Sequence, residues 1–188
     1  MGTLVQANLS DRAVVRRVLQ EHKIEAVIHF AGSALVAESA TQPLVYFENN
    51  VAGTLGLLEA MRGAGIKDIV FSSSCAIYGL PTHTPINEDQ PQKPISPYGA
   101  SKLAVECVLE WMGVVGQLRW VDLRYFNDAG ADPDGELGGE HEHETHLIPL
   151  AIGAALKQRE CLHILGGDYP TLDGTAIRDY IHVMDLRN

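Results

Sequence analysis

Residues 26–32 read Ala26-Val27-Ile28-His29-Phe30-Ala31-Gly32, a short apolar run that ends in a glycine. Such a run is typical of a strand buried in a parallel sheet. A second run, Ile69-Val70-Phe71, is followed at once by three serines, and a third is Trp120-Val121-Asp122-Leu123-Arg124-Tyr125. Because segments of helical character separate these runs, the sequence predicts a parallel sheet of the doubly wound α/β class.

Helical patterns lie between and beyond the strands. Ser10-Asp11 opens the first, in which apolar residues recur at helical spacing. Residues 81–97 contain five prolines and no apolar period, and residues 132–140 are polar, acidic and glycine-rich, so both segments predict loops. The remaining expected elements are helices over 44–62, 98–112 and 147–156 and a short strand over 162–165.

Composition narrows the class of protein. The 188 residues are 46% hydrophobic and 20% charged, as in soluble globular proteins. No apolar run approaches the ~18 residues of a membrane span, and a net charge of −10 argues against a nucleic-acid partner. Cys75, Cys107 and Cys161 are widely spaced and odd in number, so we expect reduced thiols and a cytoplasmic protein.

Tyr98 and Lys102 stand four residues apart on an expected helix, and residues four apart share a helix face. A tyrosine with an unperturbed pKa near ~10 is a poor base at neutral pH, and a neighbouring lysine favours its phenolate. Ser74 ends the serine triplet, where its hydroxyl could hold the oxygen on which a proton is exchanged. These three residues predict a site that takes a proton from an alcohol while a hydride leaves the same carbon.

Five motifs follow one another along the sequence: Val27–Gly32, Asn49–Thr54, Ser72–Gly79, Ser96–Lys102 and Arg124–Asn127. They resemble the motifs of the extended short-chain dehydrogenase/reductases, whose NAD-binding domain is Rossmann-like. A further stretch, residues 167–183, looks like the UDP-glucose 4-epimerase family in particular, and the resemblance runs from about Val5 to Leu186.

The resemblance implies that NAD and a UDP-sugar bind, and that UDP-galactose and UDP-glucose interconvert through a 4-keto intermediate with transient hydride transfer to NAD, a step of galactose metabolism. It implies that Tyr98 takes the proton of the 4-hydroxyl group, that Ser74 hydrogen-bonds the same oxygen, and that Lys102 also contacts the nicotinamide ribose. It further implies a homodimer that pairs through the helices expected over 44–62 and 98–112.

The same resemblance assigns the binding residues. A small backbone at Gly32 would let the cofactor approach closely, and Asn50 matches a cofactor-binding asparagine, although its neighbour Asn49 remains an alternative. Arg178 matches an arginine that grips the diphosphate, a task suited to a forked cation. The expected cofactor contacts are Phe30, Ala31, Gly32, Asn50, Ser72, Tyr98, Lys102 and Phe126, and the expected substrate contacts are Ser74, Asn127, His146, Leu147 and Arg178.

One family feature does not occur in this sequence. Family members hold the NAD pyrophosphate in a Gly-x-x-Gly-x-x-Gly turn at a helix N-terminus, and the sequence contains no such turn. We therefore expect an internal fragment, or the product of a truncated gene model, in which residues 1–128 form an incomplete NAD-binding Rossmann-like domain without its first βαβ unit. Residues 129–188 are expected to form part of a small substrate-binding subdomain.

The loop 141–146 reads His-Glu-His-Glu-Thr-His and invites a metal interpretation. The zincin spacing His-Glu-x-x-His fails because residue 145 is threonine. Because glycine-rich acidic loops with histidines are more often simply solvated, the sequence predicts no metal site.

Other functions remain to be weighed against the epimerase. Sugar-nucleotide dehydratases place Asp-Glu after the serine or threonine, and decarboxylases usually keep that glutamate, whereas this chain has Cys75 and Ala76 there. Chemistry at C4 alone is therefore favoured. The alternatives that stay open are a 4-epimerase for N-acetylated or uronate UDP-sugars and a truncated, non-catalytic remnant that binds a sugar nucleotide.

Overall fold

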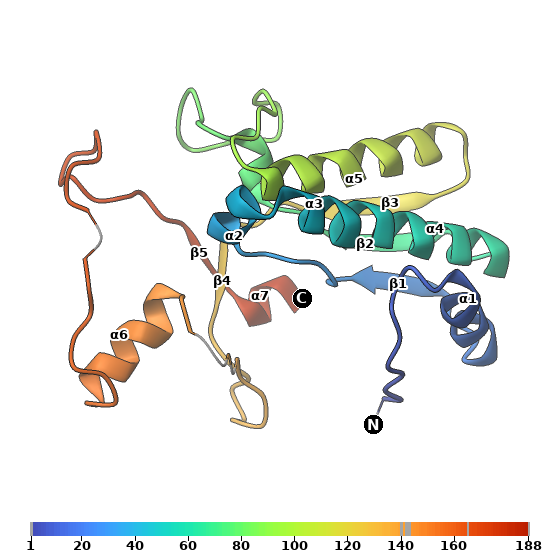
Figure 1. Cartoon of the computed structure of the whole chain (residues 1–188), viewed down its shortest axis with the longest axis horizontal. Helices are drawn as coiled ribbons and strands as arrows, with labels where there is room; N and C mark the ends of the chain where they lie inside the picture. Colours follow the sequence, from blue (N-terminus) through green and yellow to red (C-terminus); the bar gives the residue numbers. More distant parts are fainter. Residues whose placement is uncertain (1, 140, 142–143, 165, 188) are drawn as a thin grey trace. The chain divides into compact units, whose positions relative to one another are not determined.

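The structure is a computed structural model that describes residues 2–139, 141, 144–164 and 166–187 (Figure 1). The chain divides into two compact units, Met1–Arg124 and Tyr125–Asn188.

A three-stranded parallel sheet forms the centre of the first unit. Its strands are β1 (Ala26–His29), β2 (Asp68–Ser72) and β3 (Arg119–Leu123), in the order β1-β2-β3. Both pairings are parallel, and Ile69 of the central strand lies opposite Val27 on one side and Trp120 on the other. The predicted α/β class, the three strands and their parallel pairing are confirmed.

Helices supply the connections that parallel strands require. The helix expected over 44–62 is formed, but it consists of two α-helical parts joined by a π-helical segment. The proline-rich loop is also confirmed, except that Pro97 already belongs to the following helix. The helical elements of the first unit are α1 (Arg12–Glu21), α2 (Val36–Thr41), α3 (Pro43–Tyr46), the π-helical segment (Phe47–Ala52), α4 (Gly53–Ala64), a short 3-10 helix (Cys75–Tyr78) and α5 (Pro97–Val114).

Local sequence signals set the ends of these helices. A carboxylate oxygen of Asp11 accepts a hydrogen bond from the Val14 backbone at 3.2 Å and so caps α1. Ser96 caps α5 in the same way, through the Gly99 backbone N–H at 3.1 Å. At the end of α4, Gly65 adopts a left-handed conformation with a φ of 79°, which suits a residue without a Cβ.

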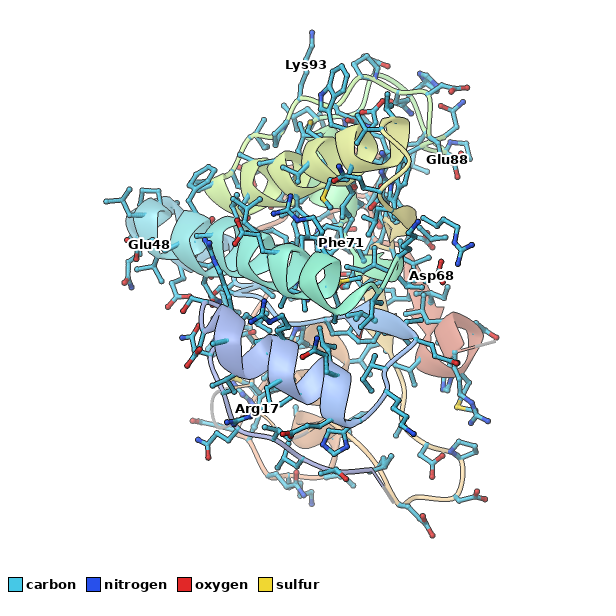
Figure 2. All side chains as sticks on the ribbon, turned by 90° about the vertical axis from the view of Figure 1, so that its right-hand side faces the viewer. Arg17, Glu48, Asp68, Phe71, Glu88 and Lys93 are labelled. Atoms are coloured by element: carbon cyan, nitrogen blue, oxygen red, sulfur yellow. The ribbon has the colours of Figure 1, made fainter. Side chains whose placement is uncertain are left out.

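The core lies between one face of the sheet and the helices α1, α4 and α5. Figure 2 shows Phe71 where α4 and α5 lie over the sheet, while Arg17 and Lys93 lie at the periphery. The buried cluster around Phe71 contains Leu19 of α1, Leu57, Leu58, Ala60 and Met61 of α4, and Val105 and Leu109 of α5, together with Ile66, Ile69 and Leu118. Each large aliphatic or aromatic side chain buried in this way contributes about 1.5–3 kcal/mol.

Two apolar side chains on the opposite face of the sheet are exposed. Ile28 of β1 is 65% exposed and Val121 of β3 is 52% exposed. Both side chains point away from the core, because successive residues of a strand face opposite sides of the sheet.

The second unit contains two short parallel strands, β4 (Asn127–Ala129) and β5 (Tyr180–His182), and the helices α6 (Leu147–Ala155) and α7 (Val183–Arg187). The helix expected over 147–156 is confirmed. The strand expected over 162–165 is wrong for residues 162–164, which have no regular structure, and Leu165 lies outside the described residues. Ile164 is 84% exposed, so its apolar side chain is not buried as that of a core strand residue would be. Among the described residues, no helix has the length and apolarity to span a membrane.

Candidate active site

Helix α5 brings Tyr98 and Lys102 together, as their spacing predicted. The ammonium nitrogen of Lys102 lies 5.9 Å from the centre of the Tyr98 ring. Tyr98 is half-buried, and its ring meets that of Tyr46 edge-on with the ring centres 6.4 Å apart. The tyrosine is thus oriented by packing, with a cation beside it.

Lys102 is held deep at the carboxyl end of β2. Its side chain is 5% exposed, and Nζ donates a hydrogen bond to the Ser72 carbonyl oxygen at 2.7 Å. Nζ also lies 4.9 Å from the centre of the Phe71 ring. Burial lowers the pKa of Lys102 to about 8, so the side chain is still mainly a cation at neutral pH.

The serine triplet follows the end of β2, at the edge of a parallel sheet where ligands bind in α/β folds. Ser74 is buried and caps the short 3-10 helix, because its Oγ accepts from the Ala76 backbone N–H at 3.2 Å. A hydroxyl that accepts in this way keeps its own hydrogen for another oxygen. The carbonyl of Ser72 binds Lys102, so the triplet and the lysine form one structural unit.

A buried ion pair braces the middle of this triplet. Ser73 donates a hydrogen bond to the carboxylate of Glu106, which also receives Nε and Nη2 of Arg124, the latter at 2.7 Å. Arg124 Nη1 donates to the hydroxyl of Tyr78 at 2.9 Å. Sequence reasoning did not identify this network, although Glu106 stands four residues beyond Lys102, on the same face of α5.

Gly32 and Asn50 lie beside the lysine, after β1. A Cβ placed on Gly32 would be 3.1 Å from Asn50 Oδ1 and 3.6 Å from Lys102 Nζ, so the backbone passes closely here. Asn50 is buried, and its amide nitrogen donates to the Ser33 carbonyl and to Ser101 Oγ, both at 3.0 Å. Its Oδ1 accepts from the Ser33 backbone N–H at 2.7 Å. Asn50 therefore holds the turn after Gly32 in place.

The other residues expected near the cofactor differ in accessibility. Phe30 is 64% exposed and Ala31 is exposed, so both present their side chains to solvent at the strand end. Asn49, the alternative to Asn50, is also exposed, and its amide donates to Ser33 Oγ at 2.9 Å.

Five predicted site residues belong to the second unit. Asn127 opens β4, and its side-chain amide donates to the Asp179 carbonyl oxygen at 2.8 Å. His146 is the residue before α6, and its Nδ1 lies 2.6 Å from a carboxylate oxygen of Glu144. The remaining three are Phe126, which is half-buried, and Leu147 and Arg178, which are exposed.

The structure thus gathers Gly32, Asn50, Ser72, Tyr98 and Lys102 around one strand end of the first unit. Ser74 lies two residues beyond Ser72 on the same segment. A half-buried tyrosine beside a buried cation can exchange a proton with an alcohol. Among the ion pairs of the residues that the structure describes, none joins Arg178 to Asp179. The guanidinium of Arg178 is therefore not paired with the carboxylate of its neighbour in the chain.

Comparison with known proteins gives the family. The family model described as "NAD dependent epimerase/dehydratase family" matches residues 2–188. A UDP-glucose 4-epimerase of Lacticaseibacillus casei is 49% identical over 181 residues, which are 96% of this chain and 55% of that protein. The chain therefore spans about half the length of this relative.

Solved structures agree with this assignment. The UDP-glucose 4-epimerase of Brucella ovis, in complex with NAD, is 50% identical with a TM-score of 0.93, over 98% of this chain and 57% of that one. The UDP-Glc/GlcNAc 4-epimerase of Campylobacter jejuni is 41% identical with a TM-score of 0.77, over 97% of this chain and 56% of that one. From its match over almost every residue, the chain belongs to the NAD-dependent epimerase/dehydratase family.

Proposed function

We propose that this chain carries the catalytic part of a UDP-glucose 4-epimerase, an NAD-dependent isomerase of galactose metabolism. The observation that carries the proposal is the position of Lys102, buried against the Ser72 carbonyl and 5.9 Å from the Tyr98 ring. The names of the relatives supply the substrate, since those that are about 50% identical over the aligned residues are UDP-glucose 4-epimerases.

The residues after β1 fit a nicotinamide cofactor. Gly32 lies within reach of Lys102, and Phe30 and Ala31 leave the strand end accessible. Gly32, Asn50, Ser72 and Phe126 would contact or position the cofactor, together with Lys102 and Tyr98. When bound, NAD supplies the reversible hydride transfer at C4 of the sugar.

The protein residues handle the proton and the orientation. Tyr98, as its phenolate, takes the proton of the sugar 4-hydroxyl, and Lys102 favours that phenolate by its charge. Ser74 donates its hydroxyl hydrogen to the same sugar oxygen, which fixes the oxygen opposite the phenol. Tyr98 returns this proton to the same oxygen when the 4-keto sugar is reduced on its other face, while Ser74 keeps its hydrogen bond to that oxygen.

The second unit would hold the rest of the substrate. Arg178 is exposed, and a guanidinium suits the diphosphate because it donates two parallel hydrogen bonds. We assign Asn127 to the sugar or the diphosphate, and His146 and Leu147 to the uridine.

We propose that the whole enzyme is a homodimer that pairs through α4 and α5 and the segment before α4. The end of α5 exposes apolar side chains: Trp111 is 69% exposed, and Val114 and the following Val115 are also exposed. Trp111 and Val115 line a shallow apolar groove along α5 with Cys107, Val108 and Met112.

A chimera tests the function directly. In it, this chain replaces the matching part of the Brucella ovis epimerase, and conversion of UDP-galactose to UDP-glucose is followed with NAD present. We expect turnover, and we expect the same chimera with Ser74→Ala and Tyr98→Phe to bind the nucleotide sugar without converting it. A chimera that folds and binds NAD but leaves UDP-galactose unchanged would contradict the proposal.

The same chimera separates the second candidate function. The Campylobacter jejuni relative is named for both UDP-glucose and UDP-GlcNAc, so UDP-N-acetylgalactosamine and a uronate UDP-sugar are assayed in parallel. A higher kcat/KM for either one would move the assignment to that 4-epimerase.

A further inference from the structure

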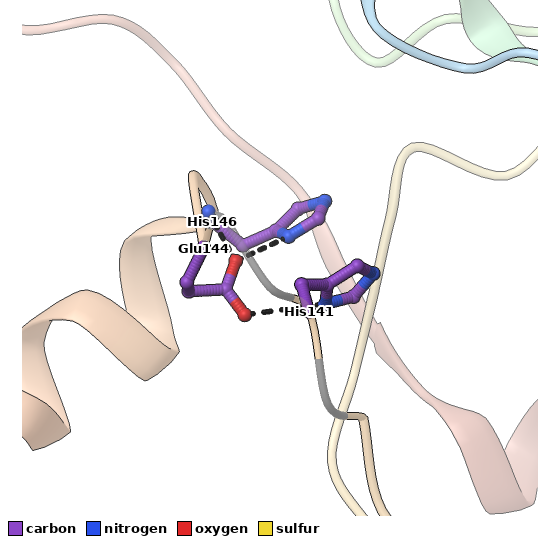
Figure 3. Close-up of side chains that lie close together, drawn as sticks. All are labelled: His141, Glu144 and His146. Carbon is purple, nitrogen blue, oxygen red and sulfur yellow. Dashed lines mark hydrogen bonds and ion pairs between the residues drawn. The ribbon is translucent and has the colours of Figure 1, made fainter.

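Three side chains of the second unit converge before α6, and the proposed reaction does not use them together. They are His141, Glu144 and His146, and Figure 3 shows the carboxylate of Glu144 facing both imidazole rings. The ligand atoms of all three lie within 4.8 Å of one another. His141 Nδ1 lies 3.3 Å from one carboxylate oxygen, and His146 Nδ1 lies 2.6 Å from the other.

Glu144 is held in place by the backbone. Its Oε1 accepts the backbone N–H groups of Thr145 at 2.8 Å and of His146 at 2.7 Å. The carboxylate is therefore already oriented between the two rings.

The donor set and its spacing suit zinc. Two imidazoles and one carboxylate, with a fourth position left to water, are a set that Zn²⁺ takes in proteins. Bonds of ~2.0–2.1 Å at tetrahedral angles separate two ligand atoms by about 3.3 Å. The His141–Glu144 distance of 3.3 Å already has this value, and the His146–Glu144 contact needs to open by less than about 1 Å.

We propose that His141, Glu144 and His146 form a binding site for Zn²⁺. Both histidine side chains are more than half exposed, at 55% and 58%, so the ion can enter from solvent. The proposal departs from the sequence prediction of no metal site, which rested on the failed His-Glu-x-x-His spacing and on the usual solvation of such loops. A loop does not need that spacing, since the ligand atoms of residues 141, 144 and 146 lie together here. The proposal does not rest on the epimerase function, in which His146 alone of the three is expected to contact the uridine.

The test titrates Zn²⁺ alone into the purified 188-residue chain at neutral pH, with calorimetry as the readout. We expect one saturable zinc per chain. His141→Ala, Glu144→Gln and His146→Ala should each weaken binding by about tenfold or more, a loss of at least ~1.4 kcal/mol. Glutamine keeps an oxygen for the two backbone N–H groups, so Glu144→Gln separates zinc binding from the start of α6. Unchanged far-ultraviolet circular dichroism verifies the fold of each variant.

Matched controls test where the zinc ion binds. His22→Ala removes an exposed histidine of the first unit and should leave zinc binding unchanged. Co²⁺ in place of zinc should give the visible absorption of a tetrahedral site, and His141→Ala should remove it. The proposal is overturned if no saturable binding occurs, if the three variants bind like the unchanged chain, or if binding is lost instead in His143→Ala or in Cys161→Ser.

Discussion

Lys102 meets two demands that oppose each other. A cation beside Tyr98 needs to stay charged, yet burial at 5% exposure lowers its pKa to about 8. The Ser72 carbonyl offsets part of the cost by accepting a hydrogen bond from Nζ at 2.7 Å. The position is therefore suited to lysine, because a shorter or neutral side chain would leave that buried carbonyl without its donor.

The phenol of Tyr98 is the part of the site most directly testable. In the chimera described above, Tyr98→Phe keeps the ring and its edge contact with Tyr46 but removes the group that exchanges the proton. We expect kcat to fall by ~10²–10⁴-fold while the UDP-sugar still binds. Steady-state kinetics and calorimetry measure the two effects separately. Turnover close to that of the unchanged chimera would exclude Tyr98 as the base.

His29 predicts a pH dependence of stability. It is buried, hydrogen-bonds with Thr54 Oγ1 at 2.8 Å, and has its pKa lowered to about 4, first by burial and then by the charge of Lys102. At pH values between the unfolded pKa of ~6.5 and the folded value, His29 is protonated in the unfolded chain and neutral in the folded chain. Stability from this group is therefore full above that unfolded pKa and falls as the pH drops through this window.

The share of His29 in the expected loss is about 2 kcal/mol between about pH 7.5 and about pH 5, and Asp122, whose pKa burial raises to about 6, acts in the opposite direction over the same range. Urea unfolding at the two pH values measures it. His29→Gln should remove that part of the dependence, whereas His83→Gln, at an exposed histidine, should retain it. An equally steep dependence in His29→Gln would show that other groups cause it.

At the scale of helices and strands, the sequence predicted helix ends from local signals but did not predict which distant strands pair. Ser10-Asp11 marked the start of α1, where Asp11 indeed caps the helix. The pair β4 and β5 escaped prediction, because strands of three residues show no period and their partners lie more than fifty residues apart. The π-helical segment inside the helix expected over 44–62 is also invisible to an apolar pattern of period 3.6.

In the candidate site, too, contacts set by local sequence could be predicted and contacts between distant segments could not. Tyr98 and Lys102 could be predicted because both lie on one helix and their spacing alone sets their proximity. The pairing of Glu106 with Arg124 could not, because it depends on how α5 packs beside β3, at the end of which Arg124 follows. A resemblance assigned Asn50 to the cofactor, and only the structure shows that its amide group is occupied by Ser33 and Ser101.

The brace between α5 and the segment after β3 should matter for stability. Glu106 is 5% exposed and Arg124 is 21% exposed in their ion pair. Glu106→Gln leaves a partly buried guanidinium without its carboxylate, so we expect a loss of about 2–3 kcal/mol, somewhat below that for fully buried pairs. Glu106→Met combined with Arg124→Met should recover part of it, because no charge then stays buried. Urea unfolding at neutral pH measures both.

The exposed pair Asp68–Arg119 is the matched control, with its Nε–Oδ1 distance of 2.5 Å. Asp68→Asn should leave the stability nearly unchanged, because exposed ion pairs contribute little. If Glu106→Gln is as harmless as Asp68→Asn, the network around Ser73 does not brace the fold.

For the molecule as a whole, the 188-residue chain by itself should bind its two ligands unequally. Helix N-termini hold pyrophosphate through free backbone N–H groups in a glycine-rich turn. The sequence contains no such turn. Helix α1 begins at Arg12, and the carboxylate of its N-cap residue Asp11 accepts the Val14 N–H and would repel a pyrophosphate. At the N-terminus of α5, Ser96 Oγ likewise accepts a backbone N–H, that of Gly99. We therefore expect NAD⁺ binding too weak to detect, and little or no turnover.

The lack of this turn should affect binding of the UDP-sugar less, because Asn127, His146 and Arg178 all lie within the chain. Calorimetric titration with UDP-glucose should give weak binding that Arg178→Ala removes, while titration with NAD⁺ under the same conditions gives no heat of binding. Arg187→Ala, at a cation near the end of the same unit, serves as the control for charge alone. Tight binding of NAD⁺ by the isolated chain would mean that backbone groups other than a glycine-rich turn receive the pyrophosphate, and the first unit would then hold the cofactor by itself.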